Sequence, residues 1–567
     1  MVMSESAAEV FLRTLGRLNV RYIFGNAGTD AAPLVEAYAR SGVRNTGPLP
    51  KPMLAAHETT AVSMAHGYAM VSGELPAVFV HVNVGTANAI CSIMNAAREN
   101  VPILLTAGRS PIYEDSRTGS RDAYIHWGQE MFDQASMLRE VVKWDYELRG
   151  PDQTELVVER AVSIAMSEPR GPVYLTLPRE VLAESTKDSA NGDIGSPRRR
   201  LSMALPPEAN AEGVVAAAQL LARAEKPLII VGNSGRHPET VCELVAFAEG
   251  FQIPVVAHSA RYLSFPSSHE LHLGFDPVGV IEEADVILVL ECDVPWIPKL
   301  SRLREGCRVI HAGPDPLFSN IPIRGFQADL VIGGDVSSLL RHMGALIRRQ
   351  RDGQRVPRNW AAATREKRIE SRAVLLNEAA SMHPIHPAWV SHCVEDIKGD
   401  AIVVNEYPLG LDHCEFTHPG TYFGSSSSAG LGWGMGAALG AKLAEPDRLV
   451  IATLGDGSYI FANPVAAHYA ASQHDLPVLF IVFNNSRWGA VHRATLKVYP
   501  DGAASAASEN AFVNLDGLPD FEQVCAAAGG YGERVERAED LPAALQRALK
   551  AVRDEKRQAL LNVICQR

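Results

Sequence analysis

Two short polar clusters, each placed directly after an apolar run, constrain this chain more than any other feature. Gly455-Asp456-Gly457-Ser458 follows the run 449–454, and Asn484-Asn485 follows the run 478–483. A helix-length stretch over 464–474 lies between them, so the pattern predicts a strand–helix–strand unit with parallel strands. Ligands bind at the carboxyl ends of such strands, where both clusters would lie. Asp and Asn oxygens at this edge suit Mg²⁺, which commonly binds phosphate groups as well.

Composition limits the possible functions of the chain. With 567 residues, 47% of them hydrophobic and 21% charged, the sequence is typical of a globular protein of two to four domains. A net charge of −12 argues against a nucleic-acid partner. The Arg-rich stretch over 348–372 is expected to be a solvated interdomain helix or linker. We expect no membrane span, because no run of 18 apolar residues exists. Eight cysteines without a CxxC pair, and no signal-like amino terminus, favour the cytoplasm.

Apolar strand-like runs alternate with helix-length segments along the whole chain, which predicts βαβ units and parallel sheets. We expect an α/β fold of three domains, with parallel sheets flanked by helices, over residues 1–186, 206–346 and 383–567. A polar stretch over 187–207 is expected to be a linker. In the first two domains the predicted strands are 20–24, 77–82, 103–105, 173–177, 228–231, 253–256, 286–290 and 308–310.

The two polar clusters together resemble the diphosphate–metal motif of enzymes that use thiamine diphosphate (ThDP), although each cluster alone is also typical of a turn. The three-domain order resembles the pyruvate-decarboxylase-like family of these enzymes over nearly the whole chain. The resemblance implies a ThDP-binding fold in the first and third domains and a Rossmann-like central domain. It also implies that Asp456, Asn485 and the backbone carbonyl of Arg487 hold Mg²⁺, which in turn holds the diphosphate of the cofactor.

Glu58 is the second element of the resemblance. It follows His57 and precedes a helix of small residues predicted over 59–71. By residue type alone, Glu58 also fits a carboxylate that interacts with a helix dipole. The resemblance implies that Glu58 hydrogen-bonds the aminopyrimidine ring of ThDP and so promotes removal of the weakly acidic thiazolium proton.

A glycine- and serine-rich segment over 424–436 leads into a helix predicted over 437–443. Such small residues also fit close packing at a helix start. In the family, a bulky apolar residue in this segment lies beneath the cofactor, and Leu431 matches it, while the carbonyl of Ala429 would accept from the cofactor's amino group. Pro408 departs from the family, in which many members carry a small hydroxyl residue. The other predicted cofactor contacts are Leu409, Gly457, Ser458, Trp488 and Gly489.

Further residues resemble those of particular branches of the family. The segment around His81 resembles the catalytic-histidine segment of benzoylformate decarboxylases, and Thr29 matches the hydroxyl residue that contacts the substrate carboxylate there. His269 matches their second histidine, although this turn also occurs in relatives without that chemistry. Gln129 instead resembles acetolactate-synthase-like members, where a Gln lies near the active centre. The predicted catalytic set is therefore Glu58, His81, Thr29, Gln129 and His269.

Three small residues influence the expected substrate. Ala490, Val491 and Ala494 align with substrate-pocket positions, and Ala494 stands where the aryl-acid enzymes carry an aromatic ring. Without that ring, stacking worth about 0.5–1.5 kcal/mol is lost, so an aryl substrate is not favoured. We expect short or medium aliphatic 2-oxo acids.

These features predict an enzyme with ThDP and Mg²⁺ as cofactors, which decarboxylates a 2-oxo acid and can ligate the product to an aldehyde acceptor. Acetolactate synthase and a FAD-bearing oxidase stay open as alternatives, although residues 228–236 lack a GxGxxG fingerprint. A non-catalytic nucleotide-binding homologue also stays open, since fold does not fix function. The resemblance further implies a homodimer or homotetramer with its active sites between subunits.

Overall fold

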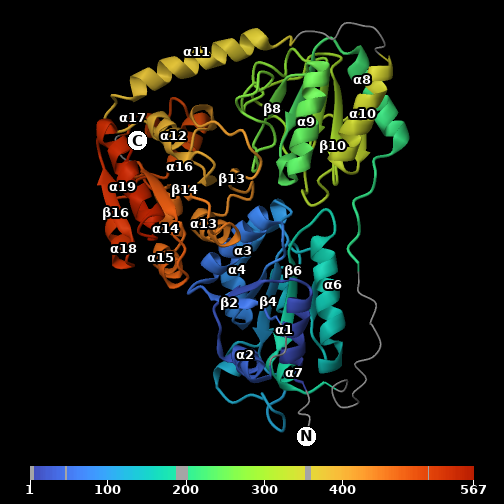
Figure 1. The fold of residues 1–567 in the computed structure, drawn as a ribbon, viewed down its shortest axis with the longest axis vertical. Helices are drawn as coiled ribbons and strands as arrows, with labels where there is room; N and C mark the ends of the chain where they lie inside the picture. The colour runs from blue at the N-terminus through green and yellow to red at the C-terminus, as the bar shows by residue number, and fades with distance from the viewer. Residues whose placement is uncertain (1–4, 45–47, 187–201, 351–358, 508–509) are drawn as a thin grey trace.

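The computed structural model describes residues 5–44, 48–186, 202–350, 359–507 and 510–567, and these form three parallel α/β sheets (Figure 1). The predicted fold class is thus confirmed. The proposed boundaries at 1–186, 206–346 and 383–567 stay predictions, and each sheet lies within one of these ranges. Most of the predicted linker, 187–201, lies outside the described residues.

The first domain holds a six-stranded sheet in the order β2-β1-β3-β4-β6-β5. Its strands are β1 (Tyr22–Gly25), β2 (Lys51–Leu54), β3 (Ala77–Val80), β4 (Leu104–Arg109), β5 (Asp145–Glu147) and β6 (Val173–Pro178). Its helices are α1 (Ala7–Arg17), α2 (Ala32–Arg44), α3 (Glu58–Ser72), α4 (Val82–Arg98), α5 (Ile125–Gly128), α6 (Thr154–Met166) and α7 (Arg179–Ala183), with short 3₁₀ turns η1 (Thr29–Ala31), η2 (Ala135–Met137) and η3 (Pro151–Gln153).

The central domain holds a five-stranded sheet in the order β11-β10-β9-β7-β8. Its strands are β7 (Pro227–Val231), β8 (Val255–Ala257), β9 (Val286–Leu290), β10 (Arg308–Gly313) and β11 (Leu330–Gly333). Its helices are α8 (Ala211–Arg223), α9 (Pro238–Phe251) and α10 (Val336–Gln350), with the turn η5 (Ser234–Arg236). Counted within the domain, the order is 2-1-3-4-5, a doubly wound arrangement.

The third domain repeats the strand order of the first. Its sheet runs β13-β12-β14-β15-β17-β16, so both six-stranded sheets have the order 2-1-3-4-6-5. Its strands are β12 (Ile402–Glu406), β13 (Tyr422–Gly424), β14 (Val450–Gly455), β15 (Leu479–Asn484), β16 (Tyr531–Val535) and β17 (Ala559–Ile564). Its helices are α12 (Pro387–Lys398), α13 (Trp433–Ala444), α14 (Asp456–Phe461), α15 (Pro464–Gln473), α16 (Gly489–Val498), α17 (Ala503–Ala506), α18 (Phe521–Ala527) and α19 (Leu541–Arg553), with turns η6 (Leu411–His413) and η7 (Ala538–Asp540).

The apolar runs become strands that are buried on both faces, as parallel sheets covered by helices require. All six residues of β15 are buried, and so are all five of β7 and of β9. Three predicted strands, 20–24, 77–82 and 253–256, are shorter in the structure. β1 and β8 each begin two residues later than predicted. β3 ends at Val80, and His81 caps the amino end of α4 instead of extending the strand.

The first and third domains meet where α3 packs against α13 (Figure 1). Two glycines allow this contact. A Cβ atom on Gly67 would lie 2.0 Å from the backbone oxygen of Ala437, and one on Gly440 would lie 1.9 Å from the backbone oxygen of Met64. The helix backbones therefore touch directly, and the small residues that the sequence shows on both helices are required by this close approach.

The Arg-rich stretch is helical on both sides of residues 351–358, which lie outside the described residues. Arg348 and Arg349 end α10, and the helix α11 (Ala362–Ala379) follows. Figure 1 shows α11 along the outer edge of the molecule, between the central and third domains. Within the described residues, no helix is both long and apolar enough to cross a membrane.

Candidate active site

Asp456 lies at the carboxyl edge of the third sheet, as predicted. It follows β14, which pairs in parallel with β15, so that Gly455 stands opposite Phe483. The carboxylate is 3% exposed and accepts hydrogen bonds from the backbone N–H of Gly457 (2.8 Å) and of Arg487 (3.2 Å). Burial raises the pKa of Asp456, and the backbone donors oppose that rise only in part. A buried carboxylate of this kind is stabilised in its charged form by a cation.

The two asparagines after β15 have different surroundings. Asn484 is fully engaged, because its amide donates to Asn562 (3.0 Å) and its oxygen accepts from the N–H of Ser486 (3.1 Å). The Oδ1 atom of Asn485 is buried and has no hydrogen-bond partner within the described part of the chain. An unpaired buried acceptor costs about 1–3 kcal/mol unless a ligand satisfies it. Asn485 next to Asp456 therefore fits a hard cation such as Mg²⁺.

The segment after Asn485 closes around the same edge. The backbone carbonyl of Arg487, the third predicted metal ligand, accepts from the N–H of Gly489 (2.8 Å) and keeps a second lone pair. The Trp488 ring lies against Gly457, where a Cβ atom would be 2.3 Å from the ring. This close packing fixes the short turn that carries Asp456 relative to residues 485–489.

Glu406, which sequence reasoning missed, organises the neighbouring backbone. It ends β12, is fully buried, and accepts from the N–H groups of Gly432 (2.7 Å) and Gly434 (2.6 Å) at the start of α13. The hydroxyl of Ser458 also bonds it. Burial raises the pKa of Glu406 to about 7. Nearby, Asn405 fixes the predicted cofactor contact Leu409 by accepting from its N–H (3.1 Å).

Ala429 and Leu431 lie on a turn that contacts the first domain. Ala429 is exposed and has a φ of +56°, which is uncommon for a residue other than glycine. Asn95 of α4 holds the residue between them, since its amide donates to the Gly430 carbonyl (2.8 Å) and its oxygen accepts from the Gly430 N–H (3.0 Å). The turn is thereby held in a defined conformation with the Ala429 side exposed.

Glu58 begins α3 after β2, with His57 as the capping residue whose Nδ1 accepts from the N–H of Thr59 (3.2 Å). The side chain is 6% exposed and accepts a hydrogen bond from Asn88 of α4 (3.1 Å). The carboxylate thus lies at a helix amino end and also at the carboxyl edge of the first sheet, and its role toward the cofactor stays a prediction.

His81 forms a three-residue group with Asp30 and Gln129. Its Nδ1–H donates to the buried carboxylate of Asp30 (2.5 Å), so a neutral ring has its lone pair on Nε2. The amide nitrogen of Gln129 lies 3.1 Å from Nε2. The hydrogen bond to Asp30 raises the pKa of His81, and burial opposes it. The Oε1 atom of Gln129 is buried without a partner in the described structure.

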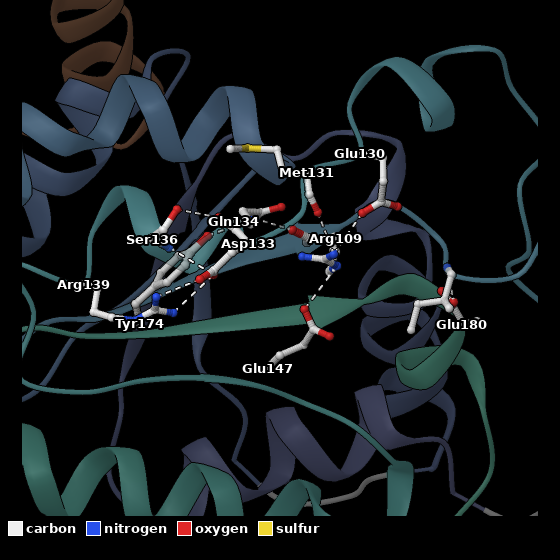
Figure 2. A network of polar contacts seen from close by, with 12 residues as sticks. Arg109, Glu130, Met131, Asp133, Gln134, Ser136, Arg139, Glu147, Tyr174 and Glu180 are labelled. Atoms are coloured by element: carbon white, nitrogen blue, oxygen red, sulfur yellow. Dashed lines mark hydrogen bonds and ion pairs between the residues drawn. The ribbon is translucent and has the colours of Figure 1, made fainter.

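The segment that carries Gln129 is fixed by a polar network, drawn in Figure 2. Arg109 donates to Glu130 (2.9 Å) and to the Met131 carbonyl (2.9 Å) and forms an ion pair with Glu147 (3.1 Å). Gln134 donates to the Tyr174 hydroxyl (2.9 Å). These contacts hold residues 129–134 against β4 and β6, and so they set the position of Gln129 beside His81.

Two predicted catalytic residues, Thr29 and His269, make no hydrogen bond to His81, Asp30 or Gln129 in the described structure. Thr29 starts η1 next to Asp30, is exposed, and makes no side-chain hydrogen bond within the described structure. His269 belongs to the central domain, where its Nε2 pairs with Glu249 (3.1 Å) and its Nδ1 accepts from the Leu271 N–H (3.1 Å). Its role stays a prediction.

The site residues thus form two groups. Glu58, His81 and Gln129 lie in the first domain, and Asp456, Asn485, Arg487 and Trp488 lie in the third. No hydrogen bond or ion pair among the described residues joins one group to the other. Asp30 and Glu406 were missed because each is a single carboxylate after a strand, without a motif of its own.

Comparison with known families gives a consistent result. Three family models match in chain order: "Thiamine pyrophosphate enzyme, N-terminal TPP binding domain" over residues 5–137, the central domain over 214–343, and the "C-terminal TPP binding domain" over 407–563. Benzoylformate decarboxylase from Pseudomonas aeruginosa is 28% identical over 562 residues, 95% of this chain and 96% of that protein. The acetolactate synthase large subunit of Buchnera aphidicola is 26% identical over 564 residues, 96% of this chain and 92% of that protein.

A solved structure agrees along the full length. The Rhodococcus jostii RHA1 thiamine diphosphate-dependent 4-hydroxybenzoylformate decarboxylase superposes with a TM-score of 0.80 at 25% identity, covering 99% of both chains. The predicted relationship to ThDP enzymes is confirmed, and the three matched domains account for the three observed sheets. The chain therefore belongs to the thiamine pyrophosphate enzyme family.

Proposed function

We propose that this protein is a ThDP- and Mg²⁺-dependent enzyme that decarboxylates a 2-oxo acid and can join the retained acyl unit to an aldehyde acceptor. The observation that carries the proposal is the buried, unpaired Oδ1 of Asn485 beside the Asp456 carboxylate. Together with the Arg487 carbonyl, these oxygens fit a metal ion that compensates a diphosphate. Bound ThDP supplies a carbon nucleophile and an electron sink for the pair that loss of CO₂ leaves behind.

The chain's own residues bind and orient the cofactor. Asp456 and Asn485 hold the metal, Ser458 and Leu409 lie at the same edge, and Trp488 closes it. Glu58 is a buried carboxylate that accepts one hydrogen bond, from Asn88, so its oxygens keep lone pairs for a ring N–H. Its role is to hold a proton at that ring nitrogen.

His81 is the residue best placed to move a proton at the substrate. Asp30 fixes its Nδ1–H and favours the protonated ring, and Nε2 faces the Gln129 amide. A histidine with a raised pKa can both donate and accept near neutral pH. Thr29 is exposed beside Asp30 and offers a hydroxyl to the substrate carboxylate.

Carboligation of the acetolactate-synthase type is the second candidate. It is favoured by Gln129, whose amide meets His81 and whose Oε1 is unpaired. An amide that both donates and accepts can orient a second carbonyl substrate. The alternative with FAD receives no support from the sequence pattern over 228–236.

A substrate panel tests the proposal. Purified protein with ThDP and Mg²⁺ is assayed against pyruvate, 2-oxobutyrate, longer aliphatic 2-oxo acids and benzoylformate. Released CO₂, aldehyde and 2-hydroxy ketone are measured separately. We expect CO₂ from at least one aliphatic acid, and ketone when aldehyde is added. Calorimetric binding of ThDP without turnover of any acid would contradict the proposed reaction, and absence of ThDP binding would contradict the proposed site.

A further inference from the structure

A cavity of about 340 Å³ lies between the central and third domains, and its lining includes none of the residues named in the proposed function. One wall is the segment 272–274, which runs beside β8, and a second wall is formed by α11. The third comes from α12 and η6. A volume of this size is in the range of small-molecule sites.

His272 lines this cavity and carries an unsatisfied donor. The side chain is 5% exposed, and its Nδ1 accepts from the N–H of Gly274 (3.2 Å). Burial, together with nearby arginines, lowers the pKa of His272 to about 3, so the ring is neutral near pH 7 and has its proton on Nε2. That Nε2 is buried and has no partner among the described residues. A buried donor of this kind requires an acceptor.

Three arginines from one face of α11 add positive charge to the same cavity. Arg365 donates to the Ser268 carbonyl (3.2 Å), and Arg368 donates to the carbonyls of Asp276 (2.9 Å) and Val278 (3.1 Å). These partners are neutral oxygens, and the carboxylate of Asp412 lies nearby. A Cβ atom on Gly274 would lie 3.0 Å from Nη1 of Arg368 and 3.9 Å from an oxygen of Asp412. Arg372 is half-buried and has no hydrogen-bond or ion-pair partner in the described part of the chain. The Arg372 side chain, which is held on α11, is therefore available to bind an anion.

The other residues that line the cavity include apolar side chains of α11 and three carboxylates. Ile369, Ala373 and Leu376 of α11 present apolar surface between and beyond the arginines. Glu395 lines the cavity but pairs with Lys398 (3.2 Å). Asp412 and Glu415 are exposed carboxylates at the third-domain wall. The lining thus combines three arginines and the His272 ring with two exposed carboxylates and one carboxylate that pairs with Lys398.

We propose that this cavity is a binding site for a small organic carboxylate with an apolar body, in which Arg372 and the Nε2–H of His272 bind the carboxylate group. The apolar residues of α11 contact the body of the ligand. Because the cavity joins the central domain, α11 and η6, an occupied site links three parts of the fold. The proposal is independent of the reaction assigned to the enzyme.

Calorimetry on the full chain, loaded with ThDP and Mg²⁺, tests the site with hexanoate as the probe. We expect binding at about 1 mM or tighter, which is reasonable for a ligand of this size. Hexan-1-ol should not bind measurably, since it lacks the charge that Arg372 pairs with. Inorganic phosphate should bind more weakly than hexanoate, because it has no apolar body.

Matched variants separate this site from the active site. Arg372→Ala should weaken hexanoate binding at least tenfold, as expected for a lost bond to a charged group, and should leave decarboxylation unchanged. His272→Asn keeps an acceptor for the Gly274 N–H, removes the Nε2 donor, and should also weaken binding. Lys367→Ala removes an exposed charge that does not line the cavity and should leave the affinity within twofold.

Other results would overturn the assignment. These are no hexanoate binding by the unaltered enzyme, equal affinity in the Arg372→Ala protein, or phosphate that binds more tightly than hexanoate. Tighter binding of 2-aminohexanoate, which adds an ammonium group, would show that Asp412 and Glu415 select a zwitterion and would also contradict the proposal.

Discussion

At the scale of single residues, the pair His81–Asp30 combines a short contact with deep burial. Asp30 is 3% exposed, and its other oxygen accepts from the N–H of Val82 (3.3 Å). Asp30 therefore orients the ring and also fixes the amino end of α4. This double role makes the carboxylate a positioning residue for His81.

The pair predicts a pH-dependent stability. The pKa of His81 is raised above its unfolded value of about 6.5, so the stabilisation is fully present below pH about 6.5 and is lost as the pH rises through the folded pKa. Asp30→Asn should lower the melting temperature more at pH 6 than at pH 9. A bond to a charged group is worth about 1.5–3 kcal/mol, so the difference is measurable by thermal scans. An equal loss at both values would show that the ring is neutral throughout.

The two asparagines after β15 give a matched pair of variants. Asn485→Leu removes an oxygen that has no partner in the described structure, so the melting temperature of the cofactor-free protein should stay the same or rise. Its Mg²⁺-dependent ThDP affinity should fall at least tenfold, measured by calorimetry. Asn484→Leu should instead destabilise the fold, because Asn562 and Ser486 lose their partner. Retained ThDP affinity in Asn485→Leu would remove Asn485 from the metal site.

Sequence could predict those residues that have a motif. Asp456 and Asn485 follow apolar runs at a defined spacing, and the structure places both at one sheet edge. Asp30 and Glu406 could not be predicted, since their importance depends on burial and on partners 51 and 26 or more positions away. Such distances along the chain leave no local pattern.

At the scale of elements, most strongly apolar strands were predicted, but β12 and β17 were not, and neither were the weakly apolar edge strands. β9 has the predicted bounds, and α15 ends one residue before the predicted 474. The edge strands β2 and β5 have few buried residues, so their composition resembles that of loops. The places of β12 and β17 in the sheet could not be predicted either. Strand order depends on contacts between segments that are far apart in the sequence.

The α3–α13 contact predicts a strong effect of one added methyl group. Gly440→Ala should destabilise the protein by about 1–3 kcal/mol, because the new carbon meets the Met64 carbonyl. Gly42→Ala is the control, since Gly42 lies in α2 with open space around its Cβ position, and it should be neutral or stabilising by about 0.5–1 kcal/mol. Thermal denaturation of both proteins decides the matter. A tolerated Gly440→Ala would mean that the helices can separate without cost.

The helix α16 carries the substrate prediction. Ala490, Val491 and Ala494 lie on this helix, which has no fully buried residue in the single chain. Their surfaces are therefore available to a ligand or to another subunit. We expect higher kcat/KM for pyruvate and 2-oxobutyrate than for benzoylformate. Ala494→Phe should shift the ratio toward benzoylformate by about tenfold, since one apolar pocket change is worth about 1–3 kcal/mol. A clear preference of the unaltered enzyme for benzoylformate would contradict the assignment.

At the scale of the whole molecule, membership of the family leads us to expect active sites that are shared between chains. Glu58 and Asp456 belong to different domains without a bond that joins their groups in the described structure. We propose a homodimer or homotetramer in which each site takes Glu58 from one subunit and Asp456 from another. Mixing inactive Glu58→Ala and Asp456→Ala proteins should restore up to about a quarter of the activity after subunit exchange, because only hybrid sites with both residues work.

Two controls accompany that experiment. Each variant mixed with itself should stay inactive. A double variant mixed with either single variant should also stay inactive, because every site in that mixture lacks Glu58 or Asp456. A monomer of full specific activity, measured by light scattering coupled to assay, would contradict the shared-site arrangement.

The identical strand order of the first and third sheets has a consequence for the origin of the protein. In both, residues of the candidate site follow the first, second and third strands. They are Asp30, Glu58 and His81 in the first domain and Leu409, Ala429 and Asp456 in the third. Two domains that agree in six strands and in the placement of these positions are best explained as copies of one ancestral unit. The predicted roles divide between the two domains, with proton handling in the first and anchoring of charge in the third. In that sense, the first and third domains resemble two related proteins that are joined in one chain.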